Sequence, residues 1–299
     1  MEAPNTKPYH LPQDAVWFIT GCSSGIGQAL AQHITKTSNR LVATARKLSA
    51  LSSLPTNERI LKLELDVTSI PSTEAAPQAT VEKFGRIDVV VNNAGYTLVG
   101  DTEGAEDQES RAVLDTNFWG MVDVTKRVLG IMRDVNPKTG QQGGVILNMS
   151  SMGGWSGYPG GSFYHASKFA MEGWTEAVAK ELPASWNRVK TNYATSSLKY
   201  MAKRHPAYAD PSYPTNVSLA YMTSEEGRRF WSEPNDLAVA IHLIVSRGQR
   251  IPIRVPLGPD SWGMIAKDLE DTKKDLDELK EISLSVGDPK QLETINFLK

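Results

Sequence analysis

The sequence contains a single cysteine, Cys22, among 299 residues. One cysteine excludes an intrachain disulfide and favours a reducing compartment, so we expect a cytoplasmic protein. Cysteine and histidine residues do not cluster at the spacing of metal ligands, and we predict no metal site. No segment approaches the roughly 18 consecutive apolar residues that a membrane span needs. The first twelve residues are polar, contain three prolines and lack the apolar core of a signal peptide.

An excess of charge of either sign is also missing. The chain has 32 basic and 34 acidic side chains, which give a net charge of −2. A basic field for nucleic acid or anionic lipid is therefore not expected. Apolar residues make up 40% and charged residues 22% of the chain. This balance is typical of a globular protein rather than a disordered one.

Short apolar runs alternate with helical patterns along most of the chain. Near-continuous β-branched residues, as at 87–91, are typical of strands covered on both faces. The expected strands are residues 16–20, 40–45, 59–65, 87–91, 144–150, 188–193 and 251–255. Alternating strands and helices indicate an α/β protein. We predict a Rossmann-type, doubly wound, mostly parallel seven-stranded sheet with helices on both faces.

A glycine-rich turn follows the first strand. Gly21, Gly25 and Gly27 stand at Gly-x-x-x-Gly-x-Gly spacing before a helical pattern that continues to about residue 37. Glycines at such a turn let backbone amides approach a phosphate, and the helix N-terminus favours negative charge. An ordinary strand-to-helix turn is the alternative, but the flanking strand and helix favour cofactor binding.

The end of the second strand indicates which dinucleotide binds. In the dinucleotide-binding fold, an acidic residue at this place holds the 2′-hydroxyl of NAD. This sequence has Ala45 there, followed by Arg46 and Lys47. A guanidinium suits a 2′-phosphate by its charge and by its forked geometry. The pair therefore favours NADP(H), although a solvated basic pair at a strand end is the simpler alternative.

Tyr164 and Lys168 stand four residues apart in a helical segment, so they lie on one face of the helix. An ammonium beside a phenol favours the phenolate and lowers the phenol's pKa, so the pair can exchange a proton with a carbonyl or an alcohol near neutral pH. Ser151, at the end of the fifth strand, can hold the substrate oxygen. Alone, a Tyr-x-x-x-Lys spacing is common and fits an amphipathic helix equally well.

Taken together, four motifs resemble the short-chain dehydrogenase/reductase family. They are the Gly21 turn, the segment Asn92-Asn93-Ala94-Gly95, Ser151, and Tyr164 with Lys168, and their order and spacing match over about residues 16–256. The resemblance implies that Tyr164 is the general acid/base, that Lys168 lowers its pKa and binds the nicotinamide ribose, and that Ser151 orients the substrate oxygen. It also implies that Asn117 holds a water that joins Lys168 to solvent.

The same resemblance implies the cofactor contacts. Asp66 and Val67 would contact the adenine, and Asn93 to Gly95 would line its pocket. Ser23 and Ile26 would add backbone contacts to the pyrophosphate and the ribose. The full set of expected cofactor residues is Gly21, Ser23, Ser24, Gly25, Ile26, Gly27, Arg46, Lys47, Asp66, Val67, Asn93, Ala94, Gly95, Tyr164, Lys168 and Thr195.

One place departs from the family pattern. After the sixth strand the family usually has Pro-Gly against the nicotinamide, whereas this chain has Ala194 and Thr195. A Thr195 hydroxyl could replace the missing backbone contact. Near Ser151, Trp155 and Tyr158 are candidate substrate contacts or packing residues, and we interpret His165 as pocket wall or interface.

Three regions complete the expected organisation. They are an N-terminal extension at residues 1–14, an NADP-binding domain at 15–259 and a C-terminal helix and tail at 260–299. Residues 196–232, rich in aromatics and prolines, are expected to form a substrate-binding lid, or else a loop whose aromatics merely pack down. A lid would suggest a partly apolar small-molecule substrate. The charged helix at about 261–282 is expected to dock on the body, with a subunit contact as the alternative.

The sequence thus predicts an NADP(H)-dependent enzyme that transfers hydride between nicotinamide and a carbonyl or alcohol carbon. The resemblance implies a homodimer or homotetramer built on the helices near 104–134 and 162–182. Imine reduction, a cofactor-assisted rearrangement and a non-catalytic nucleotide-binding module are the rival functions, because a fold does not determine a function. The sequence leaves the substrate, the reaction direction and the hydride face open.

Overall fold

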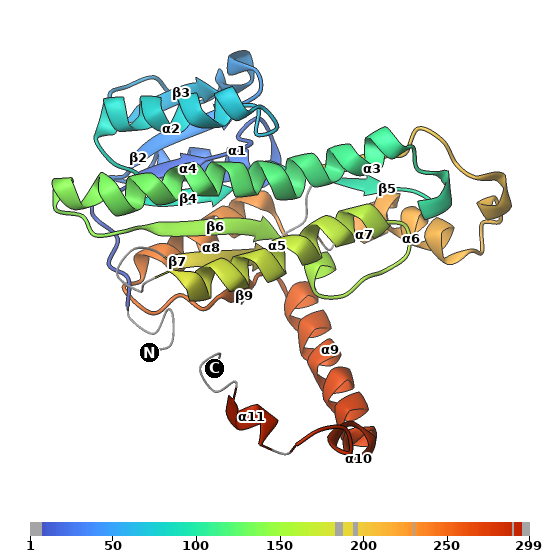
Figure 1. Cartoon of the computed structure of the whole chain (residues 1–299). Coiled ribbons are helices and arrows are strands. Elements are labelled where there is room, and N and C mark those ends of the chain that lie inside the picture. Colours follow the sequence, from blue (N-terminus) through green and yellow to red (C-terminus); the bar gives the residue numbers. More distant parts are fainter. Residues whose placement is uncertain (1–7, 183–187, 194–196, 230, 289, 295–299) are drawn as a thin grey trace.

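The computed structural model describes residues 8–182, 188–193, 197–229, 231–288 and 290–294. A seven-stranded sheet forms its centre, and every hydrogen-bonded pair in it is parallel (Figure 1). Its strands are β1 (Val16–Ile19), β2 (Arg40–Ala45), β3 (Ile60–Glu64), β4 (Val89–Asn92), β6 (Val145–Ser150), β7 (Arg188–Tyr193) and β9 (Arg254–Pro256). The seven expected strands are confirmed, and only their ends differ. The last strand, β9, begins at Arg254 rather than at Ile251, after Pro252, which has no N–H for the ladder.

The strand order across the sheet is β3-β2-β1-β4-β6-β7-β9. The strand order therefore reverses at β1: β2 and β3 lie on one side of it, and β4, β6, β7 and β9 lie on the other. In open α/β sheets a ligand crevice lies at the carboxyl ends of the strands at such a point. This is where the glycine-rich turn after β1 and the segment after β4 meet.

Helices cover both faces of the sheet (Figure 1). On one face, α1 (Gly25–Ile34) and α8 (Pro234–Ser246) pack on side chains such as Trp17 and Ile19. On the other face lie α2 (Ile70–Phe84), α4 (Gly120–Asp134) and α5 (Ser162–Glu181). Every residue of β1, β4 and β6 is buried, which explains why these strands are almost entirely apolar.

Buried polar side chains tie the sheet to α4 and α5. Asn92 Nδ2 donates to Thr125 Oγ1 at 2.9 Å and to Asn148 Oδ1 at 2.8 Å. Asn148 Nδ2 donates to Thr175 Oγ1 at 2.9 Å. Because buried polar groups must be paired, these bonds fix how both helices sit on β4 and β6.

A second, two-stranded parallel sheet was not predicted. It pairs β5 (Tyr96–Val99) with β8 (Ser197–Tyr200). Beyond β8 the chain forms a 3-10 turn (Pro206–Tyr208), α6 (Pro214–Thr223) and α7 (Glu225–Arg229). Arg204 holds this segment to the body through two bonds to the Asp101 carboxylate, at 2.5 and 3.0 Å.

The C-terminal helix does not dock on the body as expected. Helix α9 (Pro259–Glu278) leaves the sheet and extends away from it, followed by α10 (Lys280–Leu284) and α11 (Gln291–Thr294) (Figure 1). Of the residues in α9, only Ser261 is buried. The expectation failed because an amphipathic stripe indicates that a face needs a cover, without indicating what covers it.

Candidate active site

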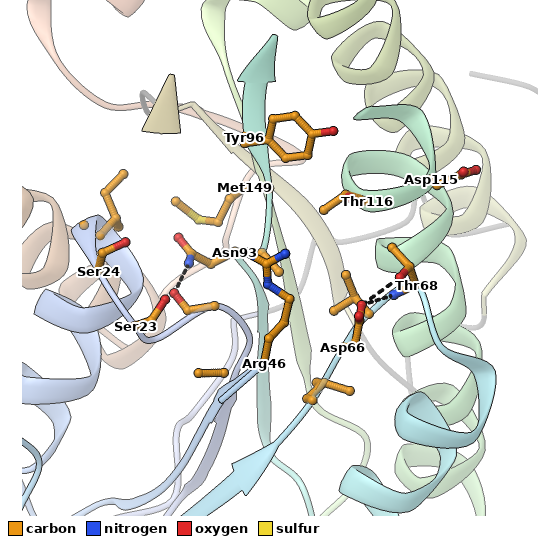
Figure 2. Close-up of a pocket in the computed structure, with 18 of the residues that line it drawn as sticks. Ser23, Ser24, Arg46, Asp66, Thr68, Asn93, Tyr96, Asp115, Thr116 and Met149 are labelled. Carbon is orange, nitrogen blue, oxygen red and sulfur yellow. Dashed lines mark hydrogen bonds between the residues drawn. The ribbon is translucent and has the colours of Figure 1, made fainter. Parts of the chain in front are cut away.

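A cavity of about 700 Å³ opens at the carboxyl ends of the central strands (Figure 2). Many expected cofactor residues line it, namely Gly21, Ser23, Ser24, Gly25, Ile26, Arg46, Asp66, Val67, Asn93, Ala94, Gly95 and Lys168. Gly27, Lys47 and Tyr164 are not among the lining residues, and Thr195 lies outside the described residues. Segments far apart in the chain thus converge at the point where the strand order reverses.

The backbone of the glycine-rich turn requires glycine at two positions. Gly21 and Gly25 have φ angles of 70° and 57°. Both values are positive and lie in the left-handed region that favours glycine. Gly27 acts differently. A Cβ on Gly27 would lie 2.4 Å from the Gly21 carbonyl oxygen, so this glycine lets α1 pack against the turn.

The N-terminus of α1 faces the cavity. Ser24 precedes the helix and caps it without a side-chain hydrogen bond. Ser23, Ser24 and Gly25 all line the cavity. Because the first N–H groups of a helix point outward and carry partial positive charge, this end of α1 suits an anion.

Asn93 holds the turn against the end of β4. Its Nδ2 donates to the carbonyl oxygens of Thr20 at 2.9 Å and Gly21 at 3.1 Å. In return, Thr20 Oγ1 accepts from the backbone N–H groups of Asn93 and Ala94, both at 2.9 Å. Asn93 therefore lines the cavity and also fixes its floor.

The two cations after β2 have different surroundings. Both are exposed, but Arg46 points into the cavity between Asn93 and Asp66, whereas Lys47 does not line it (Figure 2). In the part of the chain that the structure describes, Arg46 makes no ion pair with a carboxylate. One Asp66 oxygen accepts from Thr68 N at 2.9 Å and Thr68 Oγ1 at 2.7 Å.

Several lining residues had not been predicted. They are Ala45, Leu65, Thr68, Tyr96, Ala112, Asp115, Thr116, Met149, Ser150 and Lys199. Lys199 comes from β8, about a hundred residues beyond Tyr96 in the sequence, and its Nζ lies 5.5 Å from the centre of the Tyr96 ring. No local signal marks Lys199, because only the β5–β8 pairing brings it there. Tyr96 directly follows the predicted Gly95 and could have been included.

The lid residues contribute little else to this cavity. Tyr200, Tyr213 and Tyr221 are 52%, 42% and 57% exposed, and none of them lines it. The expected aromatic lining by these three side chains is therefore not found at the described cavity.

Ser151, Tyr164 and Lys168 are buried beside the cavity. Ser151 follows β6, whereas Tyr164 and Lys168 lie on one face of α5, and all three are at most 5% exposed. Lys168 Nζ lies 5.7 Å from the centre of the Tyr164 ring and donates to the Met149 carbonyl oxygen at 2.6 Å. The structure thus brings the phenol and the amine together, as the spacing predicted.

Burial lowers the pKa of Lys168 from 10.5 to about 8, and the nearby Glu172 carboxylate partly offsets this effect. Glu172 is itself held by Arg254, whose Nε lies 3.2 Å from Glu172 Oε2. Arg254 Nη2 also reaches Glu176 at 2.6 Å. This ion-pair group joins β9 to α5 behind the amine.

Asn117 lies in a π-helical turn (Asp115–Trp119) between α3 (Asp107–Leu114) and α4. Such turns often mark functional sites in helices. Its Oδ1 accepts from Tyr96 N at 3.0 Å, and its Nδ2 donates to Tyr96 O at 2.9 Å and to Ser167 Oγ at 3.0 Å. The side-chain amide is thus engaged with β5 and α5, and the water-holding role stays a prediction.

Tyr158 and His165 flank Ser151. Ser151 Oγ accepts from Gly153 N at 3.1 Å and is hydrogen-bonded to the Tyr158 hydroxyl, while burial raises the pKa of Tyr158. His165 Nδ1 donates to the Gly153 carbonyl at 3.0 Å, and its ring stands edge-on to Tyr158 with centres 4.1 Å apart. Burial lowers the pKa of His165, which favours the neutral imidazole, and His165 is not among the residues that line the cavity.

The described residues offer neither a metal cluster nor a membrane-spanning helix. They contain no group of three or more His, Cys, Asp or Glu side chains that could hold a metal ion. None of their helices combines the length and apolar character that a membrane crossing requires.

The sequence profile of the short chain dehydrogenase family matches residues 15–197, which is more than half of the chain. The chain belongs to the short-chain dehydrogenase family. It is therefore an oxidoreductase of a family that binds a nicotinamide cofactor and acts on small molecules.

Relatives of the whole length are found among short-chain dehydrogenases. Oxidoreductase calM from Penicillium decumbens is 42% identical over 95% of this chain and 96% of that protein. A short-chain dehydrogenase from Streptomyces avermitilis superposes with a TM-score of 0.81, at 27% identity over 93% of this chain and 100% of that one. An actinorhodin polyketide ketoreductase variant solved with NADPH has a TM-score of 0.64, at 26% identity over 83% and 97%. Structures with this fold hold NADH or NADPH, so the family does not decide the cofactor.

The residues present fit the nicotinamide cofactor of a short-chain dehydrogenase. A glycine cradle at a helix N-terminus suits a pyrophosphate. Ser23, Ser24 and Gly25 line the cavity at this end of α1.

Proposed function

We propose that the chain is an NADP(H)-dependent reductase that interconverts a carbonyl and an alcohol on a small organic molecule. The observation that carries this proposal is the proximity of buried Tyr164 and Lys168 at a cavity that Lys168 helps to line, with buried Ser151 directly after the lining residue Ser150. An acid/base, a hydrogen-bond donor and a cation at one place suit the protonation of a developing alkoxide.

Arg46 supports the choice of NADP(H). Its guanidinium points into the cavity, at the strand end where NAD-binding proteins of this fold carry an acid. Ala45 precedes it, so no carboxylate of that residue competes with a 2′-phosphate. A forked guanidinium can bind such a phosphate through two hydrogen bonds.

The proton chemistry belongs to this chain's own side chains. When bound, NADPH supplies the hydride that reaches the carbonyl carbon. Because Gly153 N–H already donates to Ser151 Oγ, the Ser151 O–H can donate to the substrate oxygen. Tyr164 gives its phenolic proton to that oxygen. The Lys168 ammonium then stabilises the phenolate left behind.

Two other functions use the same residues. Imine reduction or a cofactor-assisted rearrangement needs the same acid and cation. A non-catalytic nucleotide-binding module would need the cavity but not Ser151, Tyr164 and Lys168 together. The buried position of all three beside the cavity favours an enzyme over a binding module.

The test is a panel of ketones, 3-oxo esters and cyclic imines, followed by NADPH and NADH absorbance. We expect turnover of carbonyl substrates, with NADPH preferred. In Tyr164→Phe, turnover should fall about 10²–10⁴-fold, the contribution of a general acid, while NADPH affinity stays within a factor of about two. Turnover of imines alone would refute the carbonyl assignment, and unchanged turnover in the variant would refute the role of Tyr164.

A further inference from the structure

Helix α9 carries an apolar stripe that the single chain leaves exposed. Trp262, Leu269 and Leu276 are 67%, 52% and 65% exposed. The helix extends away from the body, and no element among the described residues covers these three side chains (Figure 1). Contiguous apolar surface of this kind marks an interaction site.

The spacing of the stripe is that of a coiled-coil seam. Within α9 the positions alternate by three and four residues, through Trp262, Ile265, Leu269, Thr272 and Leu276, and Leu279 follows at the C-cap. This is a narrow a/d seam, the pattern of a two-stranded coiled coil. A helix docked on a protein body usually presents a wider stripe, which includes an e or g position.

The charges beside the seam indicate the partner and its direction. In this register Asp268 and Asp275 occupy g positions of α9 and Lys273 occupies an e position. Lys280, the next e position in the sequence, begins α10 after a break at Leu279. In a parallel pair, each g residue faces the e residue of the partner's next heptad. Asp268 then faces the lysine at position 273 of the second copy. The lysine at position 280 lies beyond the end of α9, so the Asp268 contact is the one that α9 itself provides. An antiparallel pair would set aspartate against aspartate and lysine against lysine.

We propose that α9 is a self-association helix that packs in parallel and in register against α9 of a second copy of this chain. A lipid surface fits less well, because helices that lie on membranes are rich in Lys and Arg. Residues 259–284 carry eight acidic side chains and four lysines. Helices this short are marginal by themselves, so the pairing adds to other contacts between the two copies.

A charge exchange tests the pairing. Lys273→Glu/Lys280→Glu places acids at both flanks, and Asp268→Lys/Asp275→Lys places lysines at both. In sedimentation over a concentration series, we expect each variant to lose one association step that the wild type shows. The dissociation constant should rise by at least about tenfold, since every attractive pair along the seam becomes repulsive. An equimolar mixture of the two variants should restore the step as a heterodimer.

Lys267→Glu/Lys274→Glu is the matched control. It changes the net charge as much as Lys273→Glu/Lys280→Glu does, but both sites are on the outer face, opposite the seam. Lys267 pairs with Asp271, and Lys273 pairs with Asp277. The control and Lys273→Glu/Lys280→Glu therefore each break one of these intrahelical ion pairs. This control should sediment like the wild type. If the control and both charge-exchange variants had the same dissociation constant in sedimentation, the proposal would be overturned.

Disulfide trapping tests direction. Leu276→Cys should form a disulfide between two copies when treated with diamide, because identical a positions meet in a parallel pair. Lys274→Cys, on the outer face, should not. The native Cys22 is buried and its pKa is raised to about 12, so it does not interfere. Absence of the Leu276→Cys cross-link, or binding of the chain to vesicles of anionic phospholipid without self-association, would overturn the proposal.

Discussion

Replacing Lys168 by methionine removes an ammonium from the interior of the protein. Lys168 is 3% exposed, and burial lowers its pKa from 10.5 to about 8. In the unfolded chain the same side chain is in water and keeps its ordinary pKa. The folded and unfolded states of the wild type therefore bind different numbers of protons over part of the alkaline range.

The sign follows from which state holds the proton. Between pH 8 and 10.5 the folded protein has lost the Lys168 proton and the unfolded chain still binds it, so the free energy of unfolding rises with pH. Below pH 8 both states are protonated, and the folded state bears the full cost of the buried charge. The lowered pKa corresponds to about 3 kcal/mol in total, of which roughly 2.5 kcal/mol falls between pH 7 and 10.

The assay is urea unfolding of wild type and Lys168→Met, without cofactor, at several pH values from 7 to 10. As the pH rises from 7 to 10, we expect the free energy of unfolding of the wild type to increase by about 2–3 kcal/mol relative to that of the variant. Lys180→Met on the same helix is the control, because Lys180 is exposed and pairs only at the surface with Glu176. A difference between wild type and Lys168→Met that does not change with pH would refute the lowered pKa.

The remaining predictions concern the cofactor cradle and the catalytic serine. Arg46→Ala should weaken NADPH binding about 10–100-fold, whereas Lys47→Ala should change it less than about threefold, as titration would measure. Gly27→Ala should cost about 2 kcal/mol or more in unfolding free energy, because its Cβ has no room. Gly173→Ala, in open space on α5, should stabilise by about 0.5–1 kcal/mol. Tyr158→Phe should lower kcat/KM about 3–10-fold at unchanged NADPH affinity, since it removes the hydroxyl bonded to Ser151.

The sheet and the acid/base pair were predictable because each leaves a pattern among residues that are close together in the sequence. Apolar runs such as Val89–Asn92 are buried on both faces, and burial on both faces leaves that pattern. Tyr164 and Lys168 share a face because four residues make about one helical turn. The glycine turn was predictable for the same reason, except for Gly27, whose packing role shows only in three dimensions.

What could not be predicted depends on contacts between distant segments. Lys199 reaches the cavity only because β8 pairs with β5. The π-helical turn at Asn117 reflects side-chain bonds to Tyr96 and Ser167, which the local sequence does not display. The stripe on α9 was visible, but a periodic pattern does not say whether its cover is the same chain. Thr195 lies outside the described residues, so its proposed contact stays a prediction.

The most direct test of the proposed chemistry follows the hydride itself. NADPH carrying deuterium at the transferable C4 position would be incubated with the chain and a ketone that it turns over, and the alcohol would be analysed by mass spectrometry and NMR. The account predicts one deuterium on the former carbonyl carbon and none on the alcohol oxygen, which takes its proton from Tyr164. An alcohol without deuterium on that carbon, or cofactor that binds without being oxidised by any member of the panel, would contradict it.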